Sequence, residues 1–423
     1  MTAKYTEEQR FLRLATAHLA RSLHEARRAL DAAARRELAH WLHQWVEERP
    51  FLRSTVTRDV ITRLLCGAML QDGGAPPCAD LEVALAQCAR VDELHSRHVD
   101  IDVAVMVQEN CRGVDDLDEV TRRALVLDDY LTREPLACRP VPLYALGRVW
   151  SFVCLAEASF EQCDAHAARY FARLRRNPDA VGWDAAEAWA GMLMCASFLD
   201  DDAARCHDRG AAILAFARES AAHESPLALL RAAMCWRRAC DVDSDEARRA
   251  ARAEALVALF ESSPVNRTAA FVCQVAMALA QTTYGGTSSA QSAATAARIR
   301  TLLDSDPVFD DRASHAGNYS WSELQWFRAL GNATLSDALP TERQERALEL
   351  DARIGEHFAD VEPEALACAA RAWRHAAVGA HRAFVERALQ RVAAFGEAVA
   401  DPEWRASITR DLDRLRARLE HVQ

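Results

Sequence analysis

Long apolar, alanine-rich stretches alternate along the chain with short turns of acidic or small residues. Within the stretches, apolar positions recur every three or four residues, as is typical of amphipathic α-helices. Glycine is scarce, with 15 residues, and runs of β-branched residues are nearly absent, so nothing indicates a β-sheet. The pattern therefore predicts an all-α protein.

The turns recur with a nearly constant spacing. Turns such as "FLDDDAA" and "DVDSDEA" end at Val120, Cys163, Ala204, Ala247 and Ala290, at intervals of 41 to 43 residues. The next comparable turn, "AVGAHRA", ends 93 residues further on, which leaves room for one irregular unit. Prolines cannot continue a helix, and they follow the same period. They are Pro135, Pro178, Pro226, Pro264 and Pro307.

Each repeat is predicted to contain two helices. In one of them, "LALLRAAMCWRRAC" forms a mostly apolar first helix, "DVDSDEA" a turn, and "RRAARAEALVALF" an amphipathic second helix. A two-helix unit cannot bury its apolar side alone, so neighbouring units are expected to stack. The first helices are apolar almost all round, which indicates packing on both sides.

The stretch "AEAWAGMLMCASFLDDDAARCHDRGAAILAF" resembles a tetratricopeptide repeat. Trp189 is near the family's aromatic position in the first helix, and Ala204 and Ala211 are near its small positions in the second. "GRVWSFVCLAEASFEQCDAHAARYFARL" is similar in the same way. The resemblance covers roughly residues 78–400. The period exceeds the family's ~34 residues and resembles the longer, degenerate repeats of regulator-type superhelical domains.

The period and the resemblance together predict a right-handed superhelical array of about seven helical hairpins. The array is expected over residues 76–400, after an N-terminal helical cap region over residues 1–75. A C-terminal capping helix is expected over residues 401–423, because an array must end in a helix with one apolar and one charged face. Heptad-like positions in that helix, such as Ile408 and Leu415, are expected to pack back on the last repeat, which favours a monomer over a dimer.

Three consecutive aspartates, Asp200, Asp201 and Asp202, raise the question of a metal site. They occupy the position at which other repeats have their turn. Aspartate at this position satisfies free backbone N–H groups and complements the helix dipole. We therefore interpret the aspartates as a helix start.

A metal-dependent enzyme similar to isoprenoid and terpene synthases is the alternative. The segment "LDDYLTRE", with Asp128, Asp129 and Glu134, loosely resembles an Asp-rich motif. A facing acidic site could come only from Asp201, Asp202 and Asp208. The only lysine is Lys4, so no lysine is placed to hold a diphosphate.

Other candidate chemistry is weak. His95 and His98 are three residues apart, on one helix face near Asp92, and could bind zinc weakly, but a solvated polar face explains them as well. Hydrolase, zinc-protease and dinucleotide-binding signatures are absent from the sequence. We predict no cofactor and no metal.

Charge and cysteine content limit the ligands and the cellular compartment that we expect for the protein. The formal net charge is −11, whereas nucleic-acid binding needs a basic face. The 13 cysteines are scattered through apolar helices without a CxxC pair, as expected for reduced thiols in a cytosol. No 18-residue apolar run occurs, so we predict a cytoplasmic protein that binds neither nucleic acid nor membrane.

The resemblance implies that the first helices line a concave groove. Trp and Arg are typical anchors of protein interfaces. Packing between repeats is the alternative role for Trp189 and Trp236. The residues expected in the groove are Arg112, Arg148, Trp189, Trp236, Arg237, Gln274 and Trp326.

The predicted function is a non-enzymatic module that binds a protein or peptide in this groove, as an adaptor or as the sensor part of a regulatory system. Besides the metal-dependent enzyme, a small-molecule sensor with a closed apolar pocket is an alternative. The Lys/Asn clamp by which some tetratricopeptide proteins hold a peptide's terminal carboxylate has no counterpart in this sequence.

Overall fold

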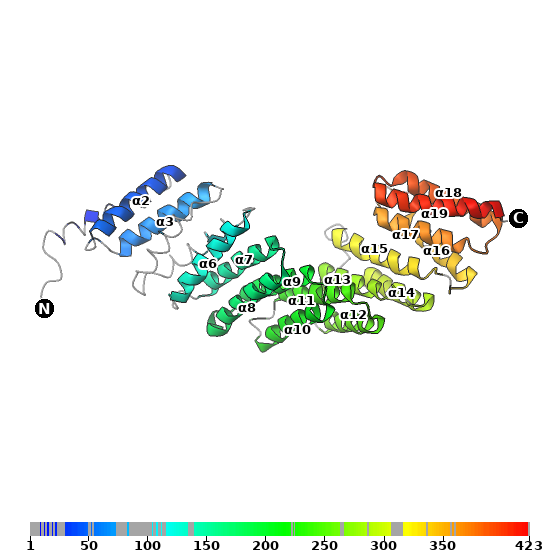
Figure 1. Ribbon diagram of the computed structural model, residues 1–423, viewed down its shortest axis with the longest axis horizontal. Coiled ribbons are helices and arrows are strands. Elements are labelled where there is room, and N and C mark those ends of the chain that lie inside the picture. The colour runs from blue at the N-terminus through cyan, green and yellow to red at the C-terminus, as the bar shows by residue number, and fades with distance from the viewer. Residues whose placement is uncertain are drawn as a thin grey trace. The chain divides into compact units, whose positions relative to one another are not determined.

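The computed structural model describes residues 30–49, 52, 55–72, 116–133, 139–220, 223, 225–262, 266–285, 287–305, 316–335, 337–355, 358 and 361–421, with single positions between residues 9 and 111. Every regular element within these residues is helical, sixteen α-helices and one 3-10 helix (Figure 1). The predicted all-α class is therefore confirmed.

The N-terminal helices are α2 (Ala32–Glu48), α3 (Thr55–Asp72) and α6 (Leu117–Arg133). Six hairpins follow, each with a first and a second helix. They are α7 (Pro140–Ala156) with α8 (Phe160–Arg176), α9 (Trp183–Leu199) with α10 (Ala203–Glu219), α11 (Pro226–Val242) with α12 (Glu246–Glu261), α13 (Ala269–Gln281) with α14 (Ser289–Ser305), α15 (Ala316–Asn332) with α16 (Pro340–Ile354), and α17 (Pro363–Ala376) with α18 (Arg382–Ala398). The short helix η4 (Pro178–Ala180) precedes α9, and α19 (Pro402–His421) follows the last hairpin.

The helix positions reproduce the repeat read from the sequence. The first helices α7, α9, α11 and α13 begin 43 residues apart, and so do the second helices α8, α10, α12 and α14. The irregular unit expected before Ala383 is the hairpin of α15 and α16. Its two helices begin 47 and 51 residues after their counterparts in the preceding hairpin.

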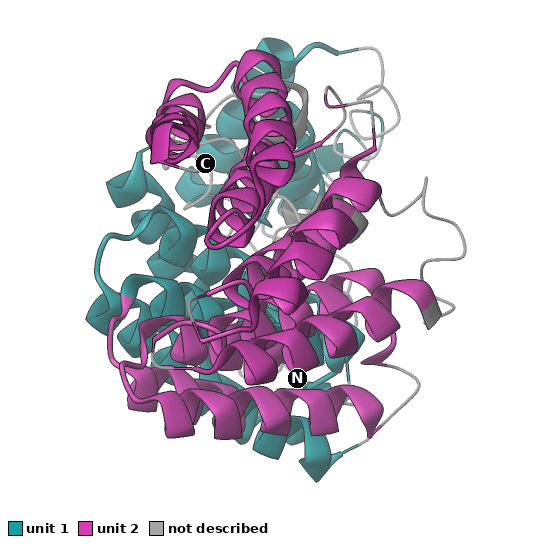
Figure 2. Cartoon of the chain, turned by 90° about the vertical axis from the view of Figure 1, so that its right-hand side faces the viewer, with its two compact units in different colours: residues 1–199, 212–231 teal, residues 200–211, 232–423 magenta. Residues whose placement is uncertain are grey.

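The chain divides into two compact units (Figure 2). Unit 1 comprises Met1–Leu199 and Ala212–Arg231, and unit 2 comprises Asp200–Ala211 and Ala232–Gln423. Helices α10 and α11 contribute residues to both units. The predicted boundaries near residues 75 and 400 stay predictions.

In unit 1, the first helix α7 packs against α6, against its own second helix α8 and against the next first helix α9. Its buried side includes Leu146 and Trp150, which are fully inaccessible to solvent. Tyr170 of α8 reaches into this core and donates a hydrogen bond of 2.9 Å to the carbonyl oxygen of Leu143. The packing thus joins α7 to both helices beside it in the chain and to the next first helix.

Unit 2 repeats the same arrangement. Helix α13 packs against α12, α14 and α15, and α17 packs against α15, α16 and α18. Helix α19 packs against α17 and α18, with Ile408 and Leu415 fully buried. These two heptad-like positions therefore lie in contacts within the chain.

Side-chain caps start the helices where the turns were predicted. Ser159, Asp202, Asp245 and Ser288 accept hydrogen bonds from backbone N–H groups in the first turns of α8, α10, α12 and α14. Each bond satisfies a donor that has no partner inside the helix. The capping side chains thus stabilise the start of each helix directly after its turn.

Two glycines inside helices of unit 1 have different surroundings. A side-chain carbon at Gly147 would lie 2.5 Å from the Tyr170 hydroxyl oxygen and 2.7 Å from Cβ of Ala188. At Gly191 of α9, the nearest described atom to such a carbon would be the Ser151 hydroxyl oxygen, at 3.8 Å. Packing therefore requires a glycine at position 147 but not at position 191.

We expect Gly147→Ala to destabilise the protein by ~1–3 kcal/mol, because a tightly packed site has to rearrange around the methyl group. The matched Gly191→Ala variant should be as stable as the natural protein or more stable by up to ~1 kcal/mol, because alanine favours helix over glycine. Denaturant unfolding followed by circular dichroism measures the stability of the two variants and of the natural protein. A lower unfolding midpoint for Gly191→Ala than for Gly147→Ala would contradict the packing described.

Candidate functional site

The three consecutive aspartates at the start of α10 have separate structural tasks. Asp202 accepts hydrogen bonds from the backbone N–H groups of Ala204 (2.8 Å) and Arg205 (3.1 Å), which caps the helix. Asp200 is 1% exposed and binds two guanidinium groups, Arg205 at 2.6 Å and Arg209 at 2.9 Å. Their interpretation as a helix start is confirmed at Asp202, while Asp200 adds a buried ion cluster.

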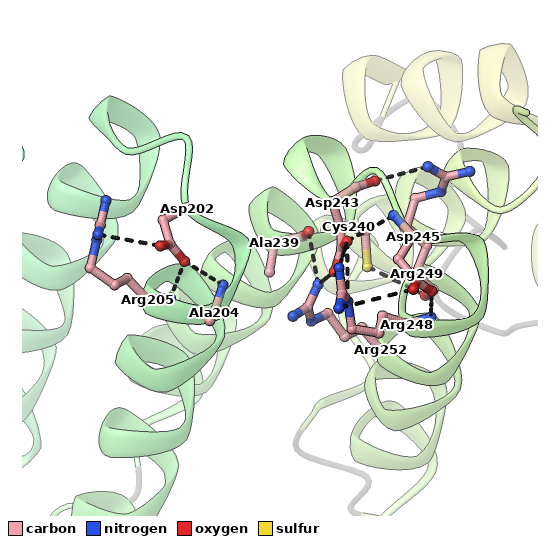
Figure 3. A network of polar contacts seen from close by, with 10 residues as sticks. All are labelled: Asp202, Ala204, Arg205, Ala239, Cys240, Asp243, Asp245, Arg248, Arg249 and Arg252. Atoms are coloured by element: carbon pink, nitrogen blue, oxygen red, sulfur yellow. Dashed lines mark hydrogen bonds and ion pairs between the residues drawn. The ribbon is translucent and has the colours of Figure 1, made fainter.

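The next turn repeats this cluster 43 residues later. Asp245 accepts from the backbone N–H of Arg248 at 2.9 Å and caps α12. Asp243 is buried, accepts from the N–H of Asp245 at 2.9 Å, and pairs with the guanidinium groups of Arg248 and Arg252 (Figure 3). Each of the four positions lies 43 residues after its counterpart in the Asp200 cluster.

Both buried carboxylates are held in the ionised form. Hydrogen bonds from Arg205 keep the pKa of Asp200 well below its ordinary value. Burial opposes ionisation of Asp243, but hydrogen bonds from Arg248 and the charge of Arg252 outweigh it and lower its pKa to about 2. The two carboxylates are therefore neutralised by arginines.

The metal-site alternative finds little support at these positions. Among the residues that the structure describes, no group of three or more His, Cys, Asp or Glu side chains is placed to hold a metal ion. Asp128, from the second Asp-rich segment, is buried and binds Arg173 at 2.8 Å as well as Arg169. Asp92, His95, His98 and Glu134 lie outside the described residues.

Two arginines of second helices link the turns of successive hairpins in unit 2. Each guanidinium donates one hydrogen bond to a backbone carbonyl of its own turn and one to a carbonyl 35 residues later, in the next turn. The planar fork of the guanidinium group presents a separate N–H donor to each of the two carbonyls. The pairs are Arg249 with Asp243 (2.8 Å) and Tyr284 (2.8 Å), and Arg343 with Ala338 (3.0 Å) and Val378 (3.1 Å).

The first helices α7, α9 and α13 are buried apart from their ends and one narrow stripe. Solvent-accessible positions recur every three or four residues along them, which places these positions on one helix face. We name these positions the first-helix stripe. In unit 1 it comprises Val141, Tyr144, Arg148, Phe152 and Leu155 of α7 with Asp184, Glu187 and Gly191 of α9, and in unit 2 Ala270, Gln274, Met277 and Gln281 of α13.

The stripe of unit 1 carries charged groups at half-buried positions. Burial raises the pKa of the Glu187 carboxyl, although the positive charges of Arg148 and Arg231 act in the opposite direction. The guanidinium carbon of Arg148 lies 5.4 Å from the centre of the Phe152 ring. Three neighbouring first helices thus bring these charges to one face.

Charged groups beside the stripe of unit 2 are paired with one another. Arg237 of α11 forms an ion pair with Asp241 one turn later. Burial raises the pKa of Asp241, and the charges of Arg237, Arg238 and Arg328 partly offset this. Arg328 of α15 makes a bidentate pair with Glu364 of α17, at 2.7 and 2.8 Å.

Two predicted groove residues of the first helices lie in the packed interior instead. Trp189 is 5% exposed, and its ring stacks on Phe171 with centres 4.5 Å apart. Trp326 is 1% exposed and lies under the guanidinium of Arg300. For both, the structure favours packing between helices over contact with a partner.

The other five predicted groove residues lie in different surroundings. Trp236 stacks on His207 of α10 and donates a 3.1 Å hydrogen bond to its carbonyl oxygen, so it also joins helices. Arg237 is 8% exposed. Arg148 and Gln274 lie on the first-helix stripe, whereas Arg112 lies outside the described residues.

Sequence reasoning missed several charged residues of this face. Glu187, Asp241 and Arg328 were not singled out, although Asp241 lies one helical turn after Arg237 and could have been found as its ion-pair partner. The others act on groups of neighbouring helices 39 to 87 residues away. Such distant neighbours have no local signal in the sequence.

Comparisons with protein-family models, with curated proteins and with solved structures found no match to the chain. Among the described helices, none combines the length and apolar character needed to cross a bilayer.

We expect Asp243→Asn to destabilise the protein by ~3–5 kcal/mol at neutral pH, because two arginines lose a buried carboxylate. Since the folded pKa of about 2 lies below the ordinary value of 3.8, this contribution is present above pH ~4 and is lost as the pH falls through 2. Denaturant midpoints of natural protein and variant should therefore converge on acidification. As a control, Asp201→Asn should have little effect, since Asp201 is 92% exposed; a pH-independent difference for Asp243→Asn would contradict the account.

Proposed function

We propose that the chain is a tetratricopeptide-like superhelical interaction module that binds a protein or peptide along its first helices. The observation that carries the proposal is the first-helix stripe. Helices that are otherwise buried present one line of half-exposed polar and apolar side chains to solvent. Such a mixed surface is suited to recognition of another chain.

The packing order supports the superhelical part of the proposal. Each first helix that is described within one unit packs against the next first helix, as α7 does on α9 and α13 on α15. The second helices α8, α12, α14 and α16 also pack against the first helix that follows each of them. Repetition of one packing step every 43 to 47 residues fits a helical-repeat architecture, in which each unit stacks on its neighbours.

The chemistry of the turns favours binding over catalysis. The acidic residues that imitate a metal motif are occupied by arginines and backbone N–H groups. The ten cysteines described are free and buried, which fits our proposal of a cytoplasmic setting. A protein or peptide partner, without cofactor, is the class of ligand that we propose.

We expect substitutions that change the charge of the stripe to abolish partner capture. Arg148→Glu on α7 and Gln274→Arg on α13 change the charge of half-exposed side chains, so the fold should persist while complementarity to the partner is lost. Affinity capture from the native lysate with quantitative mass spectrometry compares the variants with the natural protein.

The matched controls are Arg176→Glu on α8 and Ala294→Arg on α14, which place the same charges at exposed positions of second helices. These controls should retain the partner. Equal loss in all four variants, or the absence of any reproducibly captured protein, would refute the proposal.

We expect no saturable heat when Mg²⁺ or Zn²⁺ is titrated into the full chain in a calorimeter, because Asp200 and Asp243 are already neutralised. Asp201→Asn serves as the control, since Asp201 is the most exposed carboxylate of the cluster. Micromolar binding that this substitution abolishes would instead favour the metal-dependent enzyme.

A further inference from the structure

Arg148 is the arginine on the stripe of unit 1. It forms no hydrogen bond or ion pair with any described residue, and its Nε atom is buried without an acceptor. A buried guanidinium donor without an acceptor costs free energy that a bound ligand could recover. Arg237 and Arg328, in unit 2, have carboxylate partners instead.

Glu187 complements Arg148 on the adjacent helix α9. Its carboxyl group also makes no hydrogen bond within the described part of the chain, and burial disfavours its charge. Arg148 and Arg231 are near enough to act on it electrostatically, but neither forms an ion pair with it. The stripe of unit 1 therefore holds one donor group and one acceptor group that the fold leaves uncommitted.

Gly191 lies one turn after Glu187 on the same face of α9. The fold has room for a side chain there, since the nearest described atom is the Ser151 hydroxyl oxygen at 3.8 Å, and glycine inside a helix is less favourable than alanine. Its effect is to leave the helix backbone accessible beside the two uncommitted groups. Close approach of another backbone is a standard use of such a position.

We propose that the stripe of unit 1 binds an extended peptide segment with an internal acidic side chain, whose carboxylate pairs with Arg148. The peptide's backbone N–H groups face Glu187, and its backbone passes over Gly191. This inference rests on the proposed function and names the chemistry of the partner.

Spacing and polarity define the segment further. Adjacent helices are ~8–10 Å apart, which an extended chain spans in about three residues. Val141 and Leu155, on either side of Arg148 along α7, are 38% and 67% exposed, so apolar residues should flank the acidic one. An internal carboxylate is favoured over a terminal one because Arg148 is left to pair with it, whereas Arg231, the second arginine near Glu187, already donates a hydrogen bond of 3.3 Å to the sulfur of Met194.

The test uses the full chain and an array of short peptides in which one glutamate, flanked by varied apolar residues, is paired with an otherwise identical glutamine peptide. We expect binders to be enriched among the glutamate peptides. Arg148→Gln should weaken the best binder about tenfold, the loss expected for one charge-assisted hydrogen bond. Arg148→Glu should transfer the preference to peptides with lysine at the same place.

Gly191→Ala should weaken binding of the same peptide without lowering the unfolding midpoint, which separates contact with the ligand from damage to the fold. Arg176→Gln, at an exposed position of α8, is the matched control and should bind as the natural protein does. Circular dichroism confirms that each variant is folded.

The outcomes distinguish the two proposals. Binding of glutamate and glutamine peptides with equal affinity, or binding that is unaffected by Arg148→Glu, overturns the acidic-segment inference and leaves a peptide-binding module intact. Failure of every array peptide to bind, together with failure of the lysate capture, overturns both. A preference that reverses with the charge of residue 148 supports the inference.

Discussion

The hairpin turns of unit 2 depend on the fork of the arginine side chain. A guanidinium can bind one carboxylate and still donate to a second acceptor, and the turns use this capacity in two ways. Arg209 and Arg252 neutralise the buried carboxylates of Asp200 and Asp243 from the second turn of the following helix. Arg249 instead connects carbonyl groups of two successive turns. Burial of the aspartates is tolerated because both charges are paired and hydrogen-bonded. The arginine link between successive turns holds the neighbouring helices in their packing register.

The fold was largely predictable because its main signals are local. A turn needs an N-cap and a break in the helix, and residues such as Asp202 and Asp245 provide the cap within three positions of the helix start. The 43-residue spacing of the first four hairpins followed directly from these signals. The hairpin of α15 and α16 deviates from the period, and the turn spacing left room for one irregular unit without indicating where its helices begin. Handedness and the number of repeats stay predictions, because no local motif determines them.

The candidate site was less predictable because a side chain's neighbours across helices have no fixed sequence spacing. Tryptophan illustrates the difficulty. Trp189 is of a residue type that often anchors protein interfaces, but its large ring is equally suited to fill the space between helices. In this structure it packs between helices, stacked on Phe171. Arg148 was identified by register alone, whereas Glu187 gains its importance only from the adjacent helix. The two units consequently differ in a way that their composition does not show. Arg237 and Arg328 of unit 2 are paired with carboxylates, whereas Arg148 and Glu187 on the stripe of unit 1 form no ion pair with each other.

The acceptors that Arg249 and Arg343 use in the following turns determine how much the sequences of the turns can differ between repeats. Tyr284 and Val378 take part through backbone carbonyl groups, which every residue possesses. Substitution of these side chains therefore leaves the link between hairpins available, whereas substitution of the arginine removes it. Mutations can accumulate in the turn segments without separating the hairpins, which accounts for the dissimilarity of the turns "GGTSSA" and "AVGAHRA" of unit 2.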